Sequence, residues 1–276
     1  MHPSFQHELD LIDNHLRMLL RSGSSCPRPE LQRFWESLSY SLFSPGKRFR
    51  PLLSLLTAKA LGRPAEVAMP MAAAVELIHT YSLIHDDLPC MDDDDTRRGL
   101  PTSHKVFGEA MALLAGDGLL TLAFGVLARS PSPQAARAVS LLSEAAGPRG
   151  MVGGQVLDIE AKKPNVELLE QIHQRKTGAL IRVAVEGAAV LCEANPEQVE
   201  RLGAYGDHLG MAFQLADDLQ DFDPEDPEKV SFASLLGLRP TLMRLEESSQ
   251  AALAALDGLV SADGLRLLVQ LNRERV

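Results

Sequence analysis

Residues 66–95 read EVAMPMAAAVELIHTYSLIHDDLPCMDDDD, an apolar stretch that ends in a cluster of aspartates. Apolar residues recur at spacings of three and four over 66–88, which predicts a helix that is apolar on most of its circumference. The stretch 197–222 has the same outline, because it is also apolar and also ends in aspartates. A helix with apolar residues on all sides is stable only when other elements surround it, so both helices are expected at the centre of a bundle.

The rest of the chain also has a helical pattern. Leu and Ala are abundant, aromatic residues make up 5%, and clusters of β-branched residues that mark strands are missing. No Gly/Ser-rich linker or change in composition divides the 276 residues, so we expect one all-α domain over 1–276 with about ten or more helices. The further helices are predicted at 4–21, 30–43, 51–61, 108–129, 134–146, 151–161, 166–190 and in two segments between 232 and 272.

The composition excludes several classes of protein. A net charge of −10 argues against general affinity for nucleic acid or anionic lipid. The segment Met1–Asp10 is polar and acidic, unlike a secretory signal, and no eighteen consecutive residues are apolar, so we expect no membrane span and a cytoplasmic protein. Cys26, Cys90 and Cys192 are widely spaced, which predicts free thiols in a reducing compartment.

The first acidic motif places six aspartates within ten positions, at Asp86, Asp87 and Asp92–Asp95. Pro89 must end or distort the helix after Asp87, so the later acids lie in a loop. A helix C-terminus carries partial negative charge, which makes acids there unfavourable unless a cation neutralises them. The motif therefore predicts a cation site, with a solvated acidic helix end as the alternative.

The second acidic motif is Asp217-Asp218-Leu219-Gln220-Asp221. A spacing of four residues puts Asp217 and Asp221 on one helix face, about 6 Å apart along the axis. Gln214 stands one turn earlier on the same side. Oxygen ligands of this kind suit Mg²⁺, whereas neither motif has the spacing of an EF-hand calcium loop. For this motif too, a solvated acidic helix end is the alternative.

The segment 44–51 is a loop that leads into a helix and carries Gly46, Lys47, Arg48 and Arg50. Cations beside a helix N-terminus can bind a diphosphate, because backbone N–H groups and guanidinium groups complement phosphate oxygens. A charged loop without such a role is the alternative. Arg97 and Arg98 repeat the arrangement directly after the first acidic motif.

Two further positions are ambiguous from the residues alone. Lys176-Thr177 interrupts an apolar helix, where the lysine either reaches a site or extends along apolar surface to solvent. His79 precedes Asp86 by seven residues, about two turns on the same face, so it points either into a cleft or into the core.

Together these residues resemble the trans-prenyl diphosphate synthases, and most closely the bacterial farnesyl diphosphate synthases. The likeness lies in the segments GKRFRP at 46–51, HTYSLIH at 79–85, DDLPCMD at 86–92, RRGLPT at 97–102, DDLQD at 217–221 and KVSF at 229–232. It implies the isoprenoid synthase fold, a helical bundle around a central cleft, and a homodimer. The residues leave the role of 108–129 open between dimer contact and core packing.

The resemblance also implies roles for individual residues. Asp86 and Asp92 would hold two of three Mg²⁺ ions on an allylic diphosphate, and Asp217 would hold the third from the opposite wall. The whole metal-binding set implied is Asp86, Asp87, Asp92, Asp217, Asp218 and Asp221. Lys176 and Arg97 would contact the allylic diphosphate beside Gln155 and Gln214, while isopentenyl diphosphate would lie against Gly46, Lys47, Arg50, His79 and Arg98, with Lys229 as a further substrate contact.

The implied chemistry is ionisation of the allylic diphosphate, condensation with isopentenyl diphosphate and loss of a proton, with Thr177 stabilising the carbocation. Tyr81 and Ser82 precede Asp86 by about one turn, so Tyr81 would close the hydrocarbon pocket at the length of a farnesyl product. The alternatives are a geranylgeranyl or geranyl synthase, a terpene cyclase, and a non-catalytic partner subunit of an active synthase.

Two departures from the family pattern stand out. Pro45 replaces the first of two glycines in the basic loop, and only Phe222–Glu228 separate the second acidic motif from Lys229. The family has a longer loop there with a further lysine. The resemblance therefore predicts slower turnover or weaker binding of the third metal ion.

Overall fold

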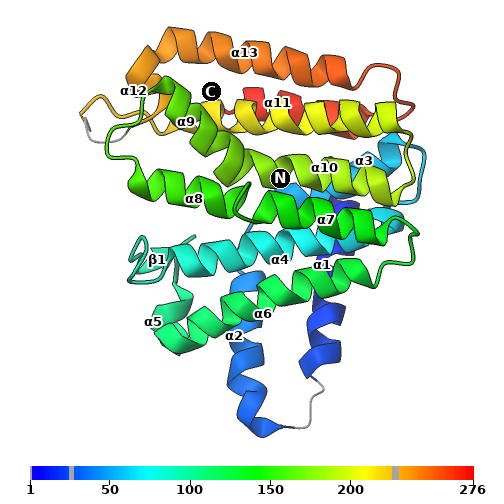
Figure 1. Cartoon of the computed structure of the whole chain (residues 1–276), viewed down its shortest axis with the longest axis vertical. Coiled ribbons are helices and arrows are strands. Elements are labelled where there is room, and N and C mark those ends of the chain that lie inside the picture. Colours follow the sequence, from blue (N-terminus) through cyan, green and yellow to red (C-terminus); the bar gives the residue numbers. More distant parts are fainter. Residues whose placement is uncertain (1, 25–27, 226–229) are drawn as a thin grey trace. The chain divides into compact units, whose positions relative to one another are not determined.

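The computed structural model describes residues 2–24, 28–225 and 230–276, and most of these are helical (Figure 1). The prediction of an all-α chain is confirmed. The described chain groups into two compact units, one of Met1–Leu52 with Met69–Pro131 and one of Leu53–Ala68 with Ser132–Val276. Helix α3, Phe49–Ala60, contributes to both. That the units form a single domain stays a prediction.

The first unit consists of helices and one short hairpin. Its elements are a 3-10 turn Pro3–Phe5, α1 Gln6–Ser24, a 3-10 turn Pro29–Leu31, α2 Gln32–Leu42, the start of α3, α4 Met69–Asp86, β1 Thr96–Arg97, β2 Leu100–Pro101, α5 Ser103–Phe107 and α6 Glu109–Ala128. Helix α4 is buried along most of its length, as its apolar circumference predicts, and α6 runs beside it (Figure 1).

The second unit is built around α11. Its elements are the rest of α3, a 3-10 turn Ala65–Ala68, α7 Ala135–Ala146, α8 Met151–Glu160, α9 Val166–His173, a π-helical turn Gln174–Gly178, α10 Ala179–Leu191, α11 Pro196–Gln220, α12 Phe232–Leu236, α13 Leu238–Ala255 and α14 Asp263–Arg273. Helices α10 and α13 both pack along α11 (Figure 1). A Cβ at Gly206 would lie 2.6 Å from the Arg182 Cα, so glycine allows α10 to approach this closely.

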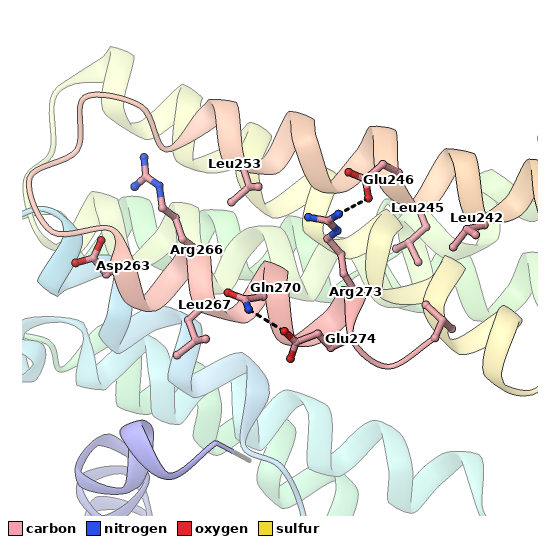
Figure 2. A pocket seen from close by; sticks show the side chains of 11 residues that line it. Leu242, Leu245, Glu246, Leu253, Asp263, Arg266, Leu267, Gln270, Arg273 and Glu274 are labelled. Atoms are coloured by element: carbon pink, nitrogen blue, oxygen red, sulfur yellow. Dashed lines mark hydrogen bonds and ion pairs between the residues drawn. The ribbon is translucent and has the colours of Figure 1, made fainter.

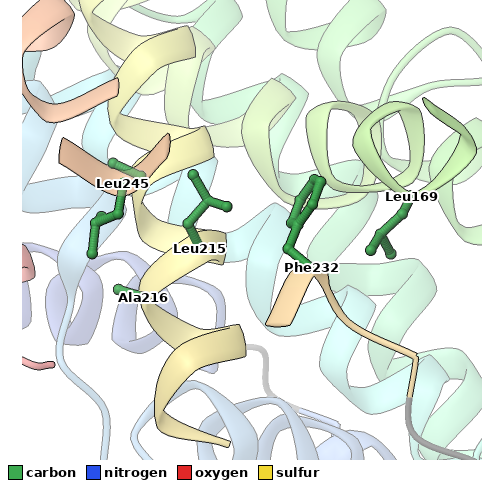
Figure 3. Close-up of a cluster of buried hydrophobic side chains, with 6 residues drawn as sticks. Leu169, Leu215, Ala216, Phe232 and Leu245 are labelled. Atoms are coloured by element: carbon green, nitrogen blue, oxygen red, sulfur yellow. The ribbon is translucent and has the colours of Figure 1, made fainter. Parts of the chain in front are cut away.

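A cluster of buried side chains supports the C-terminal half of α11 (Figure 3). Phe232 of α12 is fully buried and lies with Leu169 of α9 and Leu245 of α13 against the face of α11 that precedes the second acidic motif. The remaining buried members are Ala212, Leu215 and Ala216. Burying a Leu or Phe side chain stabilises by about 1.5–3 kcal/mol, so this cluster fixes α9 and α12 beside the end of α11.

Three helical predictions differ from the structure in detail. The stretch 166–190, predicted as one helix, contains the π-helical turn, which periodicity does not reveal because its residues remain helical in outline. The region 232–272 holds three helices instead of two, since Gly237 has a φ of 90° and separates α12 from α13. Helix α3 begins at Phe49 and not at Pro51, so Arg50 lies in its first turn.

Two helices among the described residues are long and apolar enough to cross a membrane by length and composition alone: Ala65–Asp86 and Glu109–Ala128. The sequence expectation counted uninterrupted apolar runs, whereas these helices tolerate single polar residues. The Ala65–Asp86 window is 72% buried inside the chain, which is typical of the core helix of a globular protein. The Glu109–Ala128 window is 39% buried and carries Leu113 and Leu114 on its exposed side.

Arg48 is a structural residue within the basic loop. Its guanidinium donates to Glu76 at 2.8 Å, to Asp13 at 2.9 Å and to the Leu42 carbonyl at 2.7 Å. Both Arg48 and Glu76 are buried, so this ion pair fixes the loop to α4.

We expect Arg48→Met to lower the free energy of unfolding by about 3–5 kcal/mol, because the Glu76 carboxylate is then buried without a partner. Urea denaturation followed by circular dichroism measures the change. Lys47→Met, at the exposed neighbouring position, is the control and should stay within about 0.5 kcal/mol of the wild type. Equal stabilities of the two variants would contradict the structural role of Arg48.

Candidate active site

The first acidic motif folds back onto the end of α4. After Asp86 the chain turns through Leu88, and the Asp92 N–H donates to the Asp86 carbonyl oxygen at 2.9 Å. Asp93, with a φ of 52°, donates its N–H to the Leu88 carbonyl at 3.2 Å. The loop therefore returns Asp92 to the helix end that carries Asp86, as a shared site for these two residues requires.

Arg97 pairs with two aspartates of this loop. Its Nε donates to the Asp87 carboxylate at 2.5 Å and its Nη2 to Asp94 at 3.2 Å. Asp87 is buried, and burial raises its pKa while Arg97 lowers it. Because the Asp87 carboxylate is buried as well as paired with a guanidinium, it is better placed to support the loop than to ligate a metal ion directly.

The β1–β2 hairpin positions the two arginines. Arg98 and Gly99 both have positive φ, 55° and 79°, as in the two-residue turns that match the twist of a hairpin. Arg98 Nη1 donates to the Pro45 carbonyl at 2.8 Å. A Cβ at Gly46 would lie 2.6 Å from that same nitrogen, so glycine at 46 lets the basic loop and Arg98 approach each other.

These cations surround His79. Burial, followed by the positive charges of Arg50 and Arg98, holds the pKa of His79 well below its usual value. The structure thus brings together the residues predicted for the isopentenyl diphosphate site, with exposed Lys47 beside them in the loop. A neutral imidazole among guanidinium groups presents a site that favours a polyanion.

Tyr81 lies one turn below the acidic end of α4 and is buried. Its ring meets His85 edge-on with the ring centres 5.6 Å apart, and burial with the charge of Asp86 raises the pKa of Tyr81 to about 12. His85 in turn lies against Gly116 of α6, where a Cβ would come within 2.0 Å of its Nε2. Ser82 donates its hydroxyl to the His79 carbonyl at 3.0 Å.

In the second unit, Lys176 and Thr177 lie in the π-helical turn between α9 and α10. Helix α8 packs tightly there, because a Cβ at Gly154 would lie 2.3 Å from the Lys176 backbone nitrogen. Gln155 follows on the same helix. The Lys176 ammonium pairs with Asp158 at 2.6 Å. π-helical turns often occur at functional sites, which agrees with a functional interpretation of Lys176.

Gln214 is the centre of a hydrogen-bond network at the C-terminal part of α11. Its amide oxygen accepts from the Thr177 hydroxyl at 3.2 Å and contacts the His173 Nδ1 at 2.6 Å. Its amide nitrogen donates to Asp217 at 3.3 Å. The network joins Thr177 of the π-helical turn to the first aspartate of the second motif.

The carboxylates of the second motif differ in their partners. Asp217 forms an ion pair with Arg275, whose Nη2 also donates to Gln220 at 2.7 Å. Asp218 is largely buried, accepts the Phe232 N–H at 2.6 Å, and has its pKa raised by burial. Asp221 is exposed at the C-terminus of α11. Asp217 is thus partly exposed and Asp221 exposed at the helix end, while Asp218 supports it.

Arg275, His173 and Asp158 were missed by sequence reasoning. Arg275 is separated from Asp217 by more than fifty residues, and no local pattern links the two. His173 occupies an ordinary helical position in the sequence, where the π-helical turn gave no signal. Lys229 lies outside the described residues, as does part of the shortened segment that precedes it.

Within the described residues, no three or more His, Cys, Asp or Glu side chains gather as a metal site. Inside each unit, cationic side chains neutralise several of the acids, as Arg97 does for Asp87 and Arg275 for Asp217. Asp86 with Asp92 and Asp217 with Asp221 lie in different units. That the two pairs face each other across one cleft stays a prediction.

A groove of about 760 Å³ lies between α13 and α14 (Figure 2). Leucines line it, among them Leu242 and Leu267, and Arg273 pairs with Glu246 at 2.7 Å across it. Gln270 likewise donates to Glu274 at 2.7 Å. None of the predicted site residues lines this groove, and several of its polar groups bind one another.

Comparison with known proteins decides the family. The chain matches the Polyprenyl synthetase family over residues 32–233. The chain belongs to this family. A farnesyl diphosphate synthase of Geobacillus stearothermophilus is 50% identical to this polyprenyl synthetase over 202 residues, which are 71% of this chain and 68% of that protein. A farnesyl diphosphate synthase of Micrococcus luteus is 39% identical, with 98% and 99% covered.

The polyprenyl synthetase is also similar to solved structures. The crystal structure of an FPP/GFPP synthase from Zymomonas mobilis superposes with a TM-score of 0.88 at 35% identity, covering 98% of this chain and 99% of that one. The predicted isoprenoid synthase fold and prenyltransferase activity are therefore confirmed. No observation favours the terpene cyclase alternative.

The depressed pKa of His79 predicts a pH dependence of stability. Below pH about 6.5 the unfolded chain binds a proton at this imidazole while the folded chain does not, so the free energy of unfolding falls with falling pH. His79→Asn should reduce this slope by up to about 1.4 kcal/mol per pH unit. Urea denaturation between pH 5 and 7 measures it. An unchanged slope, judged against exposed His7→Asn, would contradict the neutral state of His79.

Proposed function

We propose that this polyprenyl synthetase condenses isopentenyl diphosphate with dimethylallyl or geranyl diphosphate and releases farnesyl diphosphate. The observation that carries the proposal is the pairing of two kinds of anion site at the end of α4. Arg50 and Arg98 surround a neutral His79, which suits a diphosphate without metal. Asp86 and Asp92 lie in the adjoining loop, which suits a diphosphate held through cations.

The donor set fits Mg²⁺. The ligands offered are carboxylate oxygens at exposed or partly exposed positions, Asp86 and Asp92 on one unit and Asp217 and Asp221 on the other, which leaves room for the waters that Mg²⁺ keeps. We propose three ions, two held by Asp86 and Asp92 and one by Asp217. When bound, Mg²⁺ neutralises charge on the leaving diphosphate. Asp87 and Asp218, with protein partners at 2.5 and 2.6 Å, would support these ligands.

In this proposal the two units form one domain, which carries both acidic helix ends. Lys176 would leave its contact with Asp158 to hold the allylic diphosphate, together with Arg97. Gln155 and Gln214 would line the same region. The Thr177 oxygen, with backbone carbonyls of the π-helical turn, would stabilise positive charge as the allylic carbon–oxygen bond breaks.

The remaining steps need no nucleophile from the protein. The isopentenyl double bond attacks the allylic carbon, and the departing diphosphate accepts the proton that is then lost. The chain's own part is to hold both diphosphates, to exclude water from the carbocation and to orient the hydrocarbon tails.

The product length follows from Tyr81, which closes the hydrocarbon pocket in this proposal. Its ring is buried and fixed against His85, which Gly116 accommodates. We expect Tyr81→Ala to lengthen the product beyond fifteen carbons, because the pocket becomes deeper, while Tyr81→Phe keeps it. Mass spectrometry of dephosphorylated products measures the distribution. An unchanged distribution in Tyr81→Ala would exclude Tyr81 as the floor.

Purified protein incubated alone with Mg²⁺, dimethylallyl diphosphate and labelled isopentenyl diphosphate tests the proposed function. A fifteen-carbon product is expected, formed slowly because the segment after Asp221 is short. A ten- or twenty-carbon product would instead identify a geranyl or geranylgeranyl synthase. Absence of any product would favour the non-catalytic partner subunit, and EDTA should abolish activity in every active case.

A homodimer in the cytoplasm completes the proposal. Helix α6 exposes Leu113 and Leu114, an apolar surface that a second copy could cover. Sedimentation velocity gives the mass in solution, and a monomer at micromolar concentration would exclude this assembly.

A further inference from the structure

His173 is the last residue of α9 and directly precedes the π-helical turn that carries Lys176 and Thr177. None of the sequence motifs includes it. Its Nδ1 lies 2.6 Å from the amide oxygen of Gln214. The other ring nitrogen, Nε2, is buried and has no hydrogen-bond partner among the described residues. It lies 3.8 Å from Oδ2 of Asp218.

The orientation of the Gln214 amide follows from its neighbours. Asp217 offers only acceptor oxygens when ionised, so the Gln214 NH₂ group must face it, as it does at 3.3 Å. The amide oxygen therefore faces Thr177 and His173. Because an amide oxygen can only accept, Nδ1 of His173 carries the hydrogen and donates it.

The direction of the Thr177 hydrogen bond can be assigned in the same way, by counting donors and acceptors. A threonine hydroxyl has a single proton, and here it is donated to the Gln214 oxygen at 3.2 Å. On the side that faces away from Gln214, the Thr177 oxygen therefore presents only lone pairs. An oxygen in that state can stabilise a positive charge but cannot donate a hydrogen bond.

His173 is itself held firmly. Its ring stacks on Phe232, with ring centres 5.4 Å apart and planes inclined by 27°. Phe232 is fully buried in the cluster beneath α11 and donates its N–H to Asp218. The buried cluster around Phe232 thus fixes the His173 imidazole, and this imidazole fixes the Gln214 amide.

We propose that His173 is a positioning residue whose Nδ1–H fixes the amide orientation of Gln214, and through it the proton of Thr177 and the donor facing Asp217. This inference rests on the proposed function for its kinetic consequence, but the hydrogen bond itself is independent of activity. Without His173 the amide can rotate, and the Thr177 proton is then free to point toward the substrate.

The test compares His173→Asn with His173→Leu. Both lose the aromatic stack on Phe232, whereas only Asn keeps an N–H near the position of Nδ1. We expect His173→Leu to lower kcat by roughly 10-fold to 100-fold, as small misplacements in an active site do, with the KM for isopentenyl diphosphate unchanged. His173→Asn should recover most of the loss, and exposed His208→Asn controls for a general effect of removing a histidine.

A double-mutant cycle separates positioning from a purely structural role. If His173 acts through Gln214, His173→Leu costs nothing further in a Gln214→Ala background. Additive losses in kcat, or equal losses in the Asn and Leu variants, would overturn the proposal.

An NMR measurement without substrate or metal tests the hydrogen bond independently of the proposed function. The NMR signals of the Gln214 side-chain amide, assigned by their loss in Gln214→Glu, should shift in His173→Leu and remain near the wild-type position in His173→Asn. Unchanged signals in His173→Leu would overturn the positioning role even in an active enzyme. If the wild type is inactive but the amide signals shift as expected, the proposed function fails and the hydrogen bond stands.

Discussion

The negative charge of the aspartates at the C-terminal ends of α4 and α11 is the constraint on which the rest of the structure depends. A helix C-terminus disfavours acids, and clustered carboxylates repel each other. In this chain Arg97 stabilises the first cluster through Asp87, and Arg275 stabilises the second through Asp217. The β1–β2 hairpin and the C-terminal residues after α14 are thereby bound to the acidic helix ends.

The burial and the partners of the acids also divide them by role. Asp87 is buried against Arg97, and the largely buried Asp218 accepts the Phe232 N–H, so both shape the backbone around the motifs. Asp92 and Asp221 remain exposed. Asp217 is intermediate, since any metal ion that it binds must compete with Arg275. A local arrangement that is unfavourable without an added cation is common at functional sites and is offset by packing elsewhere, here by the cluster around Phe232.

Close backbone approach is the second theme of the structure. Four glycines lie where a Cβ would come within 3 Å of a neighbouring segment. The pairs are Gly46 with Arg98, Gly116 with His85, Gly154 with the π-helical turn, and Gly206 with α10. In each case a methyl group would overlap its neighbour, and at Gly154 and Gly206 the neighbour is backbone that cannot easily move, so these two glycines allow helix contacts that other residues would not.

The sequence by itself determined the helical class, the two acidic helix ends, the basic loop and the family, because apolar periodicity and charged clusters are local patterns. The family resemblance grouped Lys47, Arg50, His79 and Arg98 at one substrate site, and the structure places the charges of Arg50 and Arg98 near His79. Only the tertiary structure decided that Arg48 is a buried structural residue and that a π-helical turn carries Lys176. It also decided that His173 contacts Gln214 and that Arg275 contacts Asp217. These features depend on contacts between residues far apart in the chain, and their formation is governed by burial and hydrogen-bond geometry that no local pattern records.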